Sequence, residues 1–261
     1  MIGELTPLLL GGLIWAYVGA VVFLGIGVYL SFQRGRIHPV LLLSISAMSF
    51  SWIEAPYDWA MYAQFPPDLP RMPSWWPLNM TWGGLPSSVP LGYIAYFVLP
   101  AVLGSYLGTR LYLRFHWRRP IALLSTGLVV GFFWALCFNG GFGARLGVFH
   151  YGRVIGGLAL FEGTKHQYPL YDALAMGIQA MVFSYILGRT DSEGRTIIDM
   201  WADSKARTKV QSALLSIAAV IVLGNVVYGS VFLPHLITKE LDLVDTGPTE
   251  QLFEGVPNQP E

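Results

Sequence analysis

Two carboxylates four residues apart, Glu54 and Asp58, stand inside an apolar stretch of the chain. On an α-helix this spacing places both side chains on one face, about one turn apart. The apolar run that begins at residue 39 predicts that this helix crosses a membrane, and an ionisable group at that depth marks a functional site by default. Four aromatic side chains surround the pair in the sequence and are expected to contact a bound substrate: Trp52, Tyr57, Trp59 and Tyr62.

Two carboxyl groups on one dry helix face suit acid–base chemistry. Like charge and desolvation both favour a neutral carboxyl, so we expect one group to stay protonated as a general acid while the other stays ionised as a base or cation stabiliser. Aromatic faces stabilise a developing cation through their quadrupoles. The pattern therefore favours acid-initiated chemistry on a lipophilic substrate, namely ketone activation and dehydration, spiroketal closure or polyene cyclisation.

A third acid, Asp172, lies near the start of another apolar stretch, and we assign it to the same catalytic group as Glu54 and Asp58. Each of the three acids also has a structural interpretation. In the first helical turn after a proline, Asp172 would stabilise the positive end of the helix dipole. Glu54 and Asp58 would instead hydrogen-bond neighbouring helices or pair with Arg145 or Arg153. Three further polar residues are predicted to bind the substrate: Asn139, Tyr171 and Asn225.

The composition indicates an integral membrane protein. Hydrophobic residues make up 54% and charged residues 12% of the 261-residue chain, whereas a soluble domain averages about 25% charged residues. A spanning helix needs about 20 mostly apolar residues. Six stretches qualify: residues 7–32, 39–63, 90–113, 120–139, 169–187 and 210–233. The predicted fold is therefore all-α, a polytopic transmembrane helical bundle of about six spans with structured outer loops.

The distribution of charge predicts the orientation. Most of the 16 basic residues fall in the hinges after the first, third and fifth spans. By the positive-inside rule these hinges face the cytoplasm, so both termini are expected outside, in what we take to be a bacterial plasma membrane. Residues 1–238 form the predicted transmembrane domain. Residues 239–261 are polar and acidic, and we expect this tail to be disordered.

Two predicted outer loops differ from ordinary connectors. Residues 64–89 are rich in proline and tryptophan, so we expect them to pack as a lid over the bundle or to lie in the membrane interface. Residues 140–168 are rich in glycine, with an apolar part able to dip into the membrane against protein or a water-filled cavity. Together the loops predict a covered pocket at the outer end. On the cytoplasmic side, residues 190–209 fit either an amphipathic surface helix or a solvated connector.

The sequence contains no pattern for a metal, an organic cofactor or nucleic acid. Cys137 is the only cysteine, and the histidines lack metal-ligand spacing, so neither a disulfide nor a metal site is expected. No basic–aromatic patch suggests nucleic-acid binding. The expected partners are a lipophilic small-molecule substrate and membrane lipid. A membrane-protein partner, or a second copy of the chain in a homo-oligomer, is left open.

Three features together resemble the AveC-like spirocyclase family of actinobacterial membrane proteins. They are the stretch WIEAPYDW at residues 52–59, the proline- and tryptophan-rich loop after it, and YPLYD at residues 168–172. The resemblance extends over roughly residues 39–187. It implies an enzyme that closes a spiroketal from a dihydroxy ketone, with dehydration as a second activity. Only Glu54, Asp58 and Asp172 meet both this resemblance and the physical argument.

Our leading hypothesis is a cofactor-independent membrane cyclase or dehydratase, of lyase or isomerase type, that uses the three acids for spiroketal-type cyclisation of a polyketide or terpenoid. One alternative is a non-enzymatic lipid-binding protein or accessory subunit of a membrane complex. Another is a membrane terpene cyclase, since small integral-membrane terpene cyclases also protonate a polyene or epoxide with intramembrane acids. A proton-coupled carrier is disfavoured because the chain has no internal repeat.

Overall fold

The computed structural model describes residues 6–244, so residues 245–261 of the predicted tail lie outside the described range. Within that range, six helical segments are long and apolar enough to cross a membrane, as the all-α prediction requires. Their bounds are Pro7–Arg34 (α1), Pro39–Ala60 (α2, η1 and α3), Val89–Phe115 (α4), Arg119–Ala144 (α5 and η2), Leu170–Gly188 (α6) and Lys209–Glu240 (α8). A shorter helix, α7 (Ile197–Lys205), connects α6 to α8.

Proline marks the start of four of these helices. Each of α1, α2, α4 and α5 carries a proline in its first two positions. The first N–H groups of a helix have no acceptor within the helix, so a residue without an N–H costs no hydrogen bond there. The side chains of Thr6, His38 and Thr208 cap the starts of α1, α2 and α8. The turn after α1 ends on Gly35 with a φ of 65°, a left-handed conformation that glycine adopts without strain.

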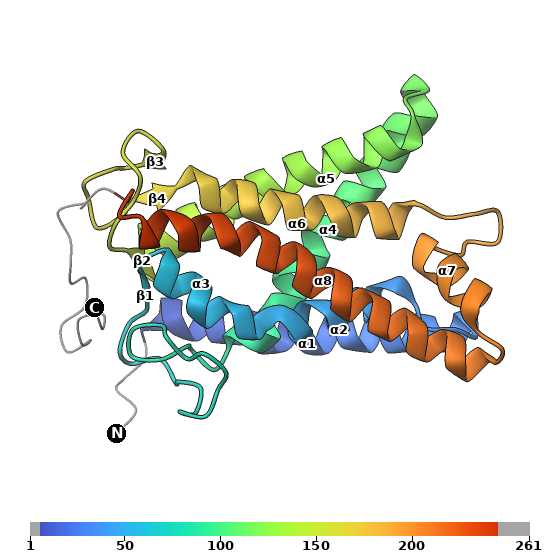
Figure 1. Cartoon of the computed structure of the whole chain (residues 1–261), viewed down its shortest axis with the longest axis horizontal. Helices are drawn as coiled ribbons and strands as arrows, with labels where there is room; N and C mark the ends of the chain where they lie inside the picture. Colours follow the sequence, from blue (N-terminus) through green and yellow to red (C-terminus); the bar gives the residue numbers. More distant parts are fainter. Residues whose placement is uncertain (1–5, 245–261) are drawn as a thin grey trace.

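The two ends of the bundle differ in structure (Figure 1). At one end, β1 (Ala63–Gln64) pairs antiparallel with β2 (His150–Tyr151), and β3 (Ala159–Leu160) pairs with β4 (Tyr168–Pro169). The start of α1 and the end of α8 lie at this end as well, and α7 lies at the opposite end. We call the two ends outer and inner, after the orientation predicted from the charges.

The helices α4, α5 and α6 pack closely because small residues line their contacts. A Cβ atom on Gly127 of α5 would come within 2.7 Å of the Met181 Cα on α6. Such close approach is typical of helix pairs in membrane proteins. By contrast, α1 is mostly exposed and covers the side of the bundle as a single helix.

The loop from residue 65 to residue 88, the first outer loop, packs against the outer end of the bundle. The Arg71 guanidinium donates to the carbonyl oxygens of Phe65, Pro66 and Gly84. Leu85 is fully buried. The base of the loop is therefore packed against the bundle, whereas its tip is exposed at Trp75 and Leu78. Whether it acts as a lid or lies in the membrane interface stays a prediction.

At the inner end, α7 is tied to the bundle by ion pairs rather than lying apart. Its Asp199 lies 3.0 Å from Arg34, and Asp203 lies 3.2 Å from Arg36. Thr196 and Asp199 form a capping box that satisfies the first backbone N–H groups of α7. The segment is therefore a short packed helix.

Candidate active site

The expected second span is interrupted next to its two acids. The helix α2 (Pro39–Phe50) ends in a 3₁₀ turn, η1 (Ser51–Ile53), before α3 (Glu54–Ala60) begins. Pro56 lies in the first turn of α3, where it is tolerated, whereas inside a continuous helix it would remove a backbone hydrogen bond. Glu54 and Asp58 share α3 and line the same cavity, as their spacing predicts.

This cavity has a volume of about 530 Å³ and lies between α1, α3, α4, η2, α6 and α8, and the first outer loop contributes to its wall. Its walls are mainly apolar and aromatic. The titratable and amide members of its lining are Glu54, Tyr57, Asp58, Tyr93, Tyr96, Asn139, Tyr151, Asp172 and Tyr228. All three acids singled out in the sequence therefore face one space, although Asp172 is more than a hundred residues from the other two.

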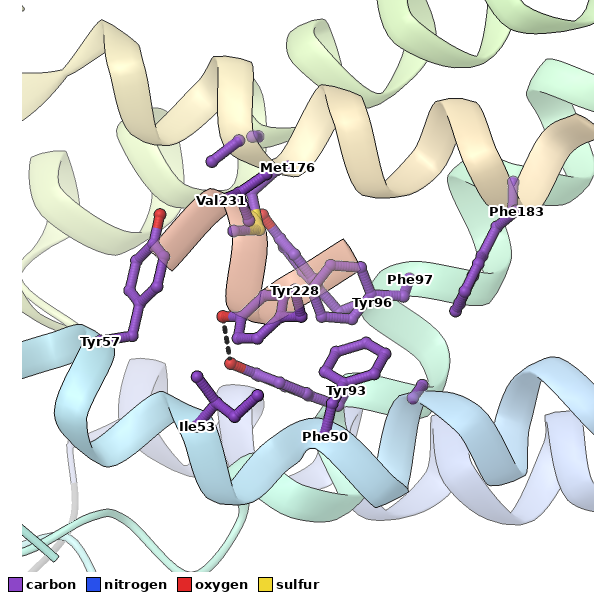
Figure 2. Packing of buried hydrophobic residues seen from close by; sticks show 14 of the residues in the cluster. Phe50, Ile53, Tyr57, Tyr93, Tyr96, Phe97, Met176, Phe183, Tyr228 and Val231 are labelled. Atoms are coloured by element: carbon purple, nitrogen blue, oxygen red, sulfur yellow. Dashed lines mark hydrogen bonds between the residues drawn. The ribbon is translucent and has the colours of Figure 1, made fainter. Parts of the chain in front are cut away.

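Glu54 sits against two phenols from distant helices. The hydroxyls of Tyr93 on α4 and Tyr228 on α8 both donate to its Oε2 atom, the second at 2.6 Å. The two hydroxyl oxygens also lie 2.7 Å from each other (Figure 2). Phe50 stacks on the Tyr228 ring with a centroid distance of 4.7 Å, which holds the phenol in place.

Asp172 is the most heavily bonded acid. Its Oδ2 atom accepts from Asn139 Nδ2 at 3.0 Å, Tyr151 Oη at 3.2 Å and Tyr168 Oη at 2.9 Å. Its Oδ1 atom accepts from Tyr57 Oη at 2.9 Å. Burial, followed by the charge of Asp172, raises the pKa of Tyr151 and of Tyr168 well above the ordinary value, so both remain neutral donors.

Asn139 reaches Asp172 because the end of the fourth span is wound as a π-helix. The segment η2 (Leu136–Ala144) is a nine-residue π-helix that continues α5. Its glycine-rich sequence packs closely, since a Cβ on Gly140 would come within 3.0 Å of the Tyr168 ring. Insertions of this type inside α-helices are frequent at functional sites.

Asp58 is hydrogen-bonded by the first outer loop. Thr81 Oγ1 donates to Asp58 Oδ2 at 3.2 Å, and both side chains are buried. Across residues 6–244, no arginine or lysine forms an ion pair with any of the three acids. Arg145 and Arg153, the partners considered from the sequence, instead lie over the rings of Phe161 and Tyr62.

Five residues expected to bind substrate do not line the cavity. Trp52 is 37% exposed, and its Nε1 atom donates to Asn225 Oδ1 at 2.9 Å. The rings of Trp59 and Tyr62 lie under the Lys239 ammonium group. The Tyr171 hydroxyl accepts from the backbone N–H of Ile155. Tyr57 and Asn139, by contrast, lie in the lining and bond Asp172.

The structure also adds groups that the sequence did not single out. Tyr93 and Tyr96 lie three residues apart on α4, a spacing that places two phenols on one helix face and that is visible in the sequence. Tyr151 and Tyr168 come from the second outer loop. His235 on α8 has its Nε2 atom 3.3 Å from the Tyr57 hydroxyl. In the described part of the chain, no three histidine, cysteine or acidic side chains are grouped to hold a metal ion.

A family model described as Spirocyclase AveC-like matches residues 32–259. The match covers most of the chain, more than the 39–187 range of the resemblance, and it includes every acid of the cavity. No curated protein and no solved structure matches the chain.

Proposed function

Since the chain belongs to the AveC-like spirocyclase family, we propose that its outer cavity closes a spiroketal from a lipophilic dihydroxy ketone with loss of water. The observation that carries this proposal is the convergence of Glu54, Asp58 and Asp172 on one mainly apolar cavity of about 530 Å³. Apolar walls suit a lipophilic substrate, and ligand cavities typically measure roughly 300–1,000 Å³. The family supports the cyclase class, and the roles below follow from the hydrogen bonds.

Asp172 is the proposed base. An ionised carboxylate accepts at about four lone-pair sites and donates nothing, and Asp172 accepts from four neutral donors. Three of these donors bond Oδ2, so Oδ1 keeps a free acceptor site beside the Tyr57 hydroxyl. A substrate hydroxyl bound at Oδ1 would lose its proton to Asp172 as it attacks the ketone carbon.

Glu54 is the proposed acid. Its Oε2 atom and the hydroxyls of Tyr93 and Tyr228 make three mutual oxygen–oxygen contacts. Because both phenols donate to Oε2, the acidic proton is assigned to Oε1, from which it can pass to the substrate without breaking either bond. Once Glu54 has given up its proton, both phenols donate to the carboxylate and stabilise it. Asp58, which bonds Thr81, is a second acid on the same helix face.

The proposed reaction uses Glu54 and Asp172 in two rounds. In the first, Glu54 protonates the ketone oxygen while one substrate hydroxyl attacks the carbonyl carbon and gives its proton to Asp172, which yields a hemiketal. In the second, Asp172 protonates the hemiketal hydroxyl, which leaves as water. The second hydroxyl attacks the oxocarbenium carbon and its proton goes to Glu54, so both acids regain their starting states. The surrounding aromatic faces stabilise the cationic intermediate.

The position of α1 gives a lipophilic substrate a route to the cavity. Residues of its outer half, from Pro7 to Ala16, line the cavity, while other residues of the same helix are exposed on the side of the bundle. A single helix therefore separates the cavity from surrounding lipid on this side. Within the described residues, Gly11 and Gly12 have no atom within 4 Å of the place where a Cβ would lie, so no neighbouring helix packs against α1 at these two positions.

The test uses the full chain in lipid nanodiscs and a symmetrical ketone with a hydroxyl on the δ carbon of each arm. Closure of this probe gives two six-membered rings joined at a spiro carbon, and uncatalysed closure gives a racemate. We expect the protein to produce an excess of one enantiomer, measured by chiral gas chromatography. Glu54→Gln should lower the rate by about 100-fold or more, because it removes the acid. Glu162→Gln, which changes an exposed outer-loop acid, is the matched control.

Racemic product at the rate of protein-free nanodiscs would contradict the proposal. A wild-type chain that binds the probe without closing it, and that co-purifies with a second membrane protein, would favour the accessory subunit instead. Loss of folding in Glu54→Gln, seen as a lowered unfolding temperature, would favour a structural role for the acid.

A further inference from the structure

The cavity wall contains a phenol that the proposed reaction does not use. Tyr96 lies on α4 one turn from Tyr93, lines the cavity and is 8% exposed. Within residues 6–244 no group accepts a hydrogen bond from its hydroxyl. The Asn139 side chain lies within hydrogen-bond reach of the phenol oxygen as a donor, so the phenol proton itself is left without an acceptor in this range. The other phenols of the lining differ from Tyr96, because each of their hydroxyls bonds Glu54 or Asp172.

A second donor without an acceptor lies close to Tyr96. The indole Nε1 of Trp134 on α5 is buried and has no partner within the described residues. The rings of Tyr96 and Trp134 pack with centroids 6.2 Å apart. A buried donor left without an acceptor is costly. Of these two residues Tyr96 lines the cavity, so its hydroxyl is the donor suited to a ligand that supplies the acceptor.

We propose that Tyr96 recognises an oxygen atom of the lipophilic ligand, its hydroxyl donating a hydrogen bond to a hydroxyl or carbonyl oxygen. Tyr96 is placed for this among the aromatic rings that α3, α4 and α8 contribute to the core (Figure 2). Asn139 lies on its other side and bonds Asp172 at 3.0 Å. An oxygen held by Tyr96 is thereby brought close to the proposed base.

This inference rests on the proposed function for the kind of ligand. It adds that Tyr96 selects ligands that carry an oxygen atom on their apolar chain. A hydrocarbon polyene offers no lone pair to the Tyr96 hydroxyl and would leave it unpaired. Tyr96 therefore discriminates between an oxygenated substrate and a pure hydrocarbon of the same length. Discrimination by a hydrogen bond to a buried group is stronger than discrimination by apolar contact alone.

The experiment measures binding rather than turnover. The probes are a long-chain α,ω-diol and the n-alkane of equal chain length, neither of which can form a spiroketal. Their dissociation constants are measured by native mass spectrometry of the full chain, for wild type, Tyr96→Phe and Tyr106→Phe. Tyr106 is a matched control because it lies on the same helix, 54% exposed on the outside of the bundle.

We expect Tyr96→Phe to weaken binding of the diol roughly two- to tenfold, the range of one hydrogen bond, and to leave alkane binding unchanged. Its unfolding temperature should change little, because the phenol proton has no acceptor among residues 6–244 of the free protein and the Asn139 amide beside it keeps its bond to Asp172. Tyr106→Phe should change neither probe. Equal weakening of both probes, no weakening of the diol, or a wild type that does not prefer the diol would each overturn the inference.

The measurements distinguish a failure of the recognition role of Tyr96 from a failure of the proposed reaction. If diol binding depends on Tyr96 and the dihydroxy ketone is still not closed, the proposed reaction fails and the recognition role stands. If the ketone is closed with the same kcat/KM by wild type and Tyr96→Phe, the recognition role fails and the reaction stands.

Discussion

The inner and outer ends of the bundle both contain clustered acids, but these acids have different partners. At the inner end, Asp199 pairs with Arg34, and Asp203 pairs with Arg36. A hydrogen bond from Ser212 lowers the pKa of Asp203. Desolvation opposes this shift and the charge of Arg36 adds to it, so the pKa lies below its usual range. Asp203 therefore stays ionised, and the two acids tie α7 to α8 and to the turn between α1 and α2.

Among residues 6–244, the groups that bond the acids of the outer cavity are all neutral. Glu54 and Asp172 accept from phenols and one amide, and Asp58 accepts from a threonine hydroxyl. A carboxyl with neutral partners can lose or gain a proton without leaving a buried cation behind, and proton transfer requires this freedom. An acid paired with arginine lacks it, since removing the charge breaks the pair. The type of partner, more than the number of acids, thus separates a structural cluster from a catalytic candidate.

The largest effect is expected for Asp172→Asn. The variant keeps the shape of the side chain but removes the proposed base and places an amide among four donors. Closure of the dihydroxy ketone should slow by about 100-fold or more, measured by the rate of enantiomerically enriched product per folded molecule. An unchanged rate would mean that the outer cluster is as structural as the inner one.

The same change at the inner end should act on stability alone. Asp199→Asn removes the carboxylate that pairs with Arg34 and that completes the capping box with Thr196. We expect a loss of about 1–3 kcal/mol in the free energy of unfolding, seen as a lower unfolding temperature in nanodiscs. Closure per folded molecule should stay at the wild-type rate. A variant with normal stability and no turnover would contradict the structural role assigned to the acids of the inner end.

A smaller effect is expected from filling the cavity through α1. Gly12 lines the cavity and has open space at its Cβ position. Gly12→Phe should therefore be tolerated by the fold but lower turnover by roughly tenfold, since misplaced substrates react slowly. Gly25→Phe is the matched control, because Gly25 also has open space on α1 but does not line the cavity. Equal turnover of the two variants would count against substrate binding in this cavity.

The smallest effect is expected for Trp52→Phe. Trp52 bonds Asn225 outside the cavity lining, so turnover should change by less than about twofold, as for most substitutions away from a functional site. The measurement is the same closure assay. A loss as large as that of Asp172→Asn would place the substrate on the Trp52 side of α3, away from the cavity.

Much of the architecture follows from local sequence. The six predicted spans correspond to the six observed helical segments, although α8 runs to Glu240, beyond the expected end at residue 233. The length of an apolar stretch and a proline at a helix start are properties of the local sequence, so they predict the helices without knowledge of the tertiary structure. The shared face of Glu54 and Asp58 is local for the same reason, because four residues make about one helical turn.

The partners of these acids were not predictable in the same way. Asp172 was singled out by its type and depth, but its bonds to Tyr57, Tyr151 and Asn139 join three separate segments. The 3₁₀ turn η1 and the π-helix η2 depart from the regular α-helix that an apolar pattern predicts. Both departures lie next to cavity residues, so a period of 3.6 residues could not place every side chain correctly.

The sequence by itself determined the helical spans, the uneven charge of their hinges, the family and the three acids that lie in apolar helical segments. Only the tertiary structure decided that these acids share one cavity, that phenols from α3, α4 and α8 surround them, and that Trp52 and Asn225 lie outside it. The reason is physical. Backbone hydrogen bonds set the period of each helix locally, whereas the rotation of one helix against the next depends on side-chain packing across the whole bundle.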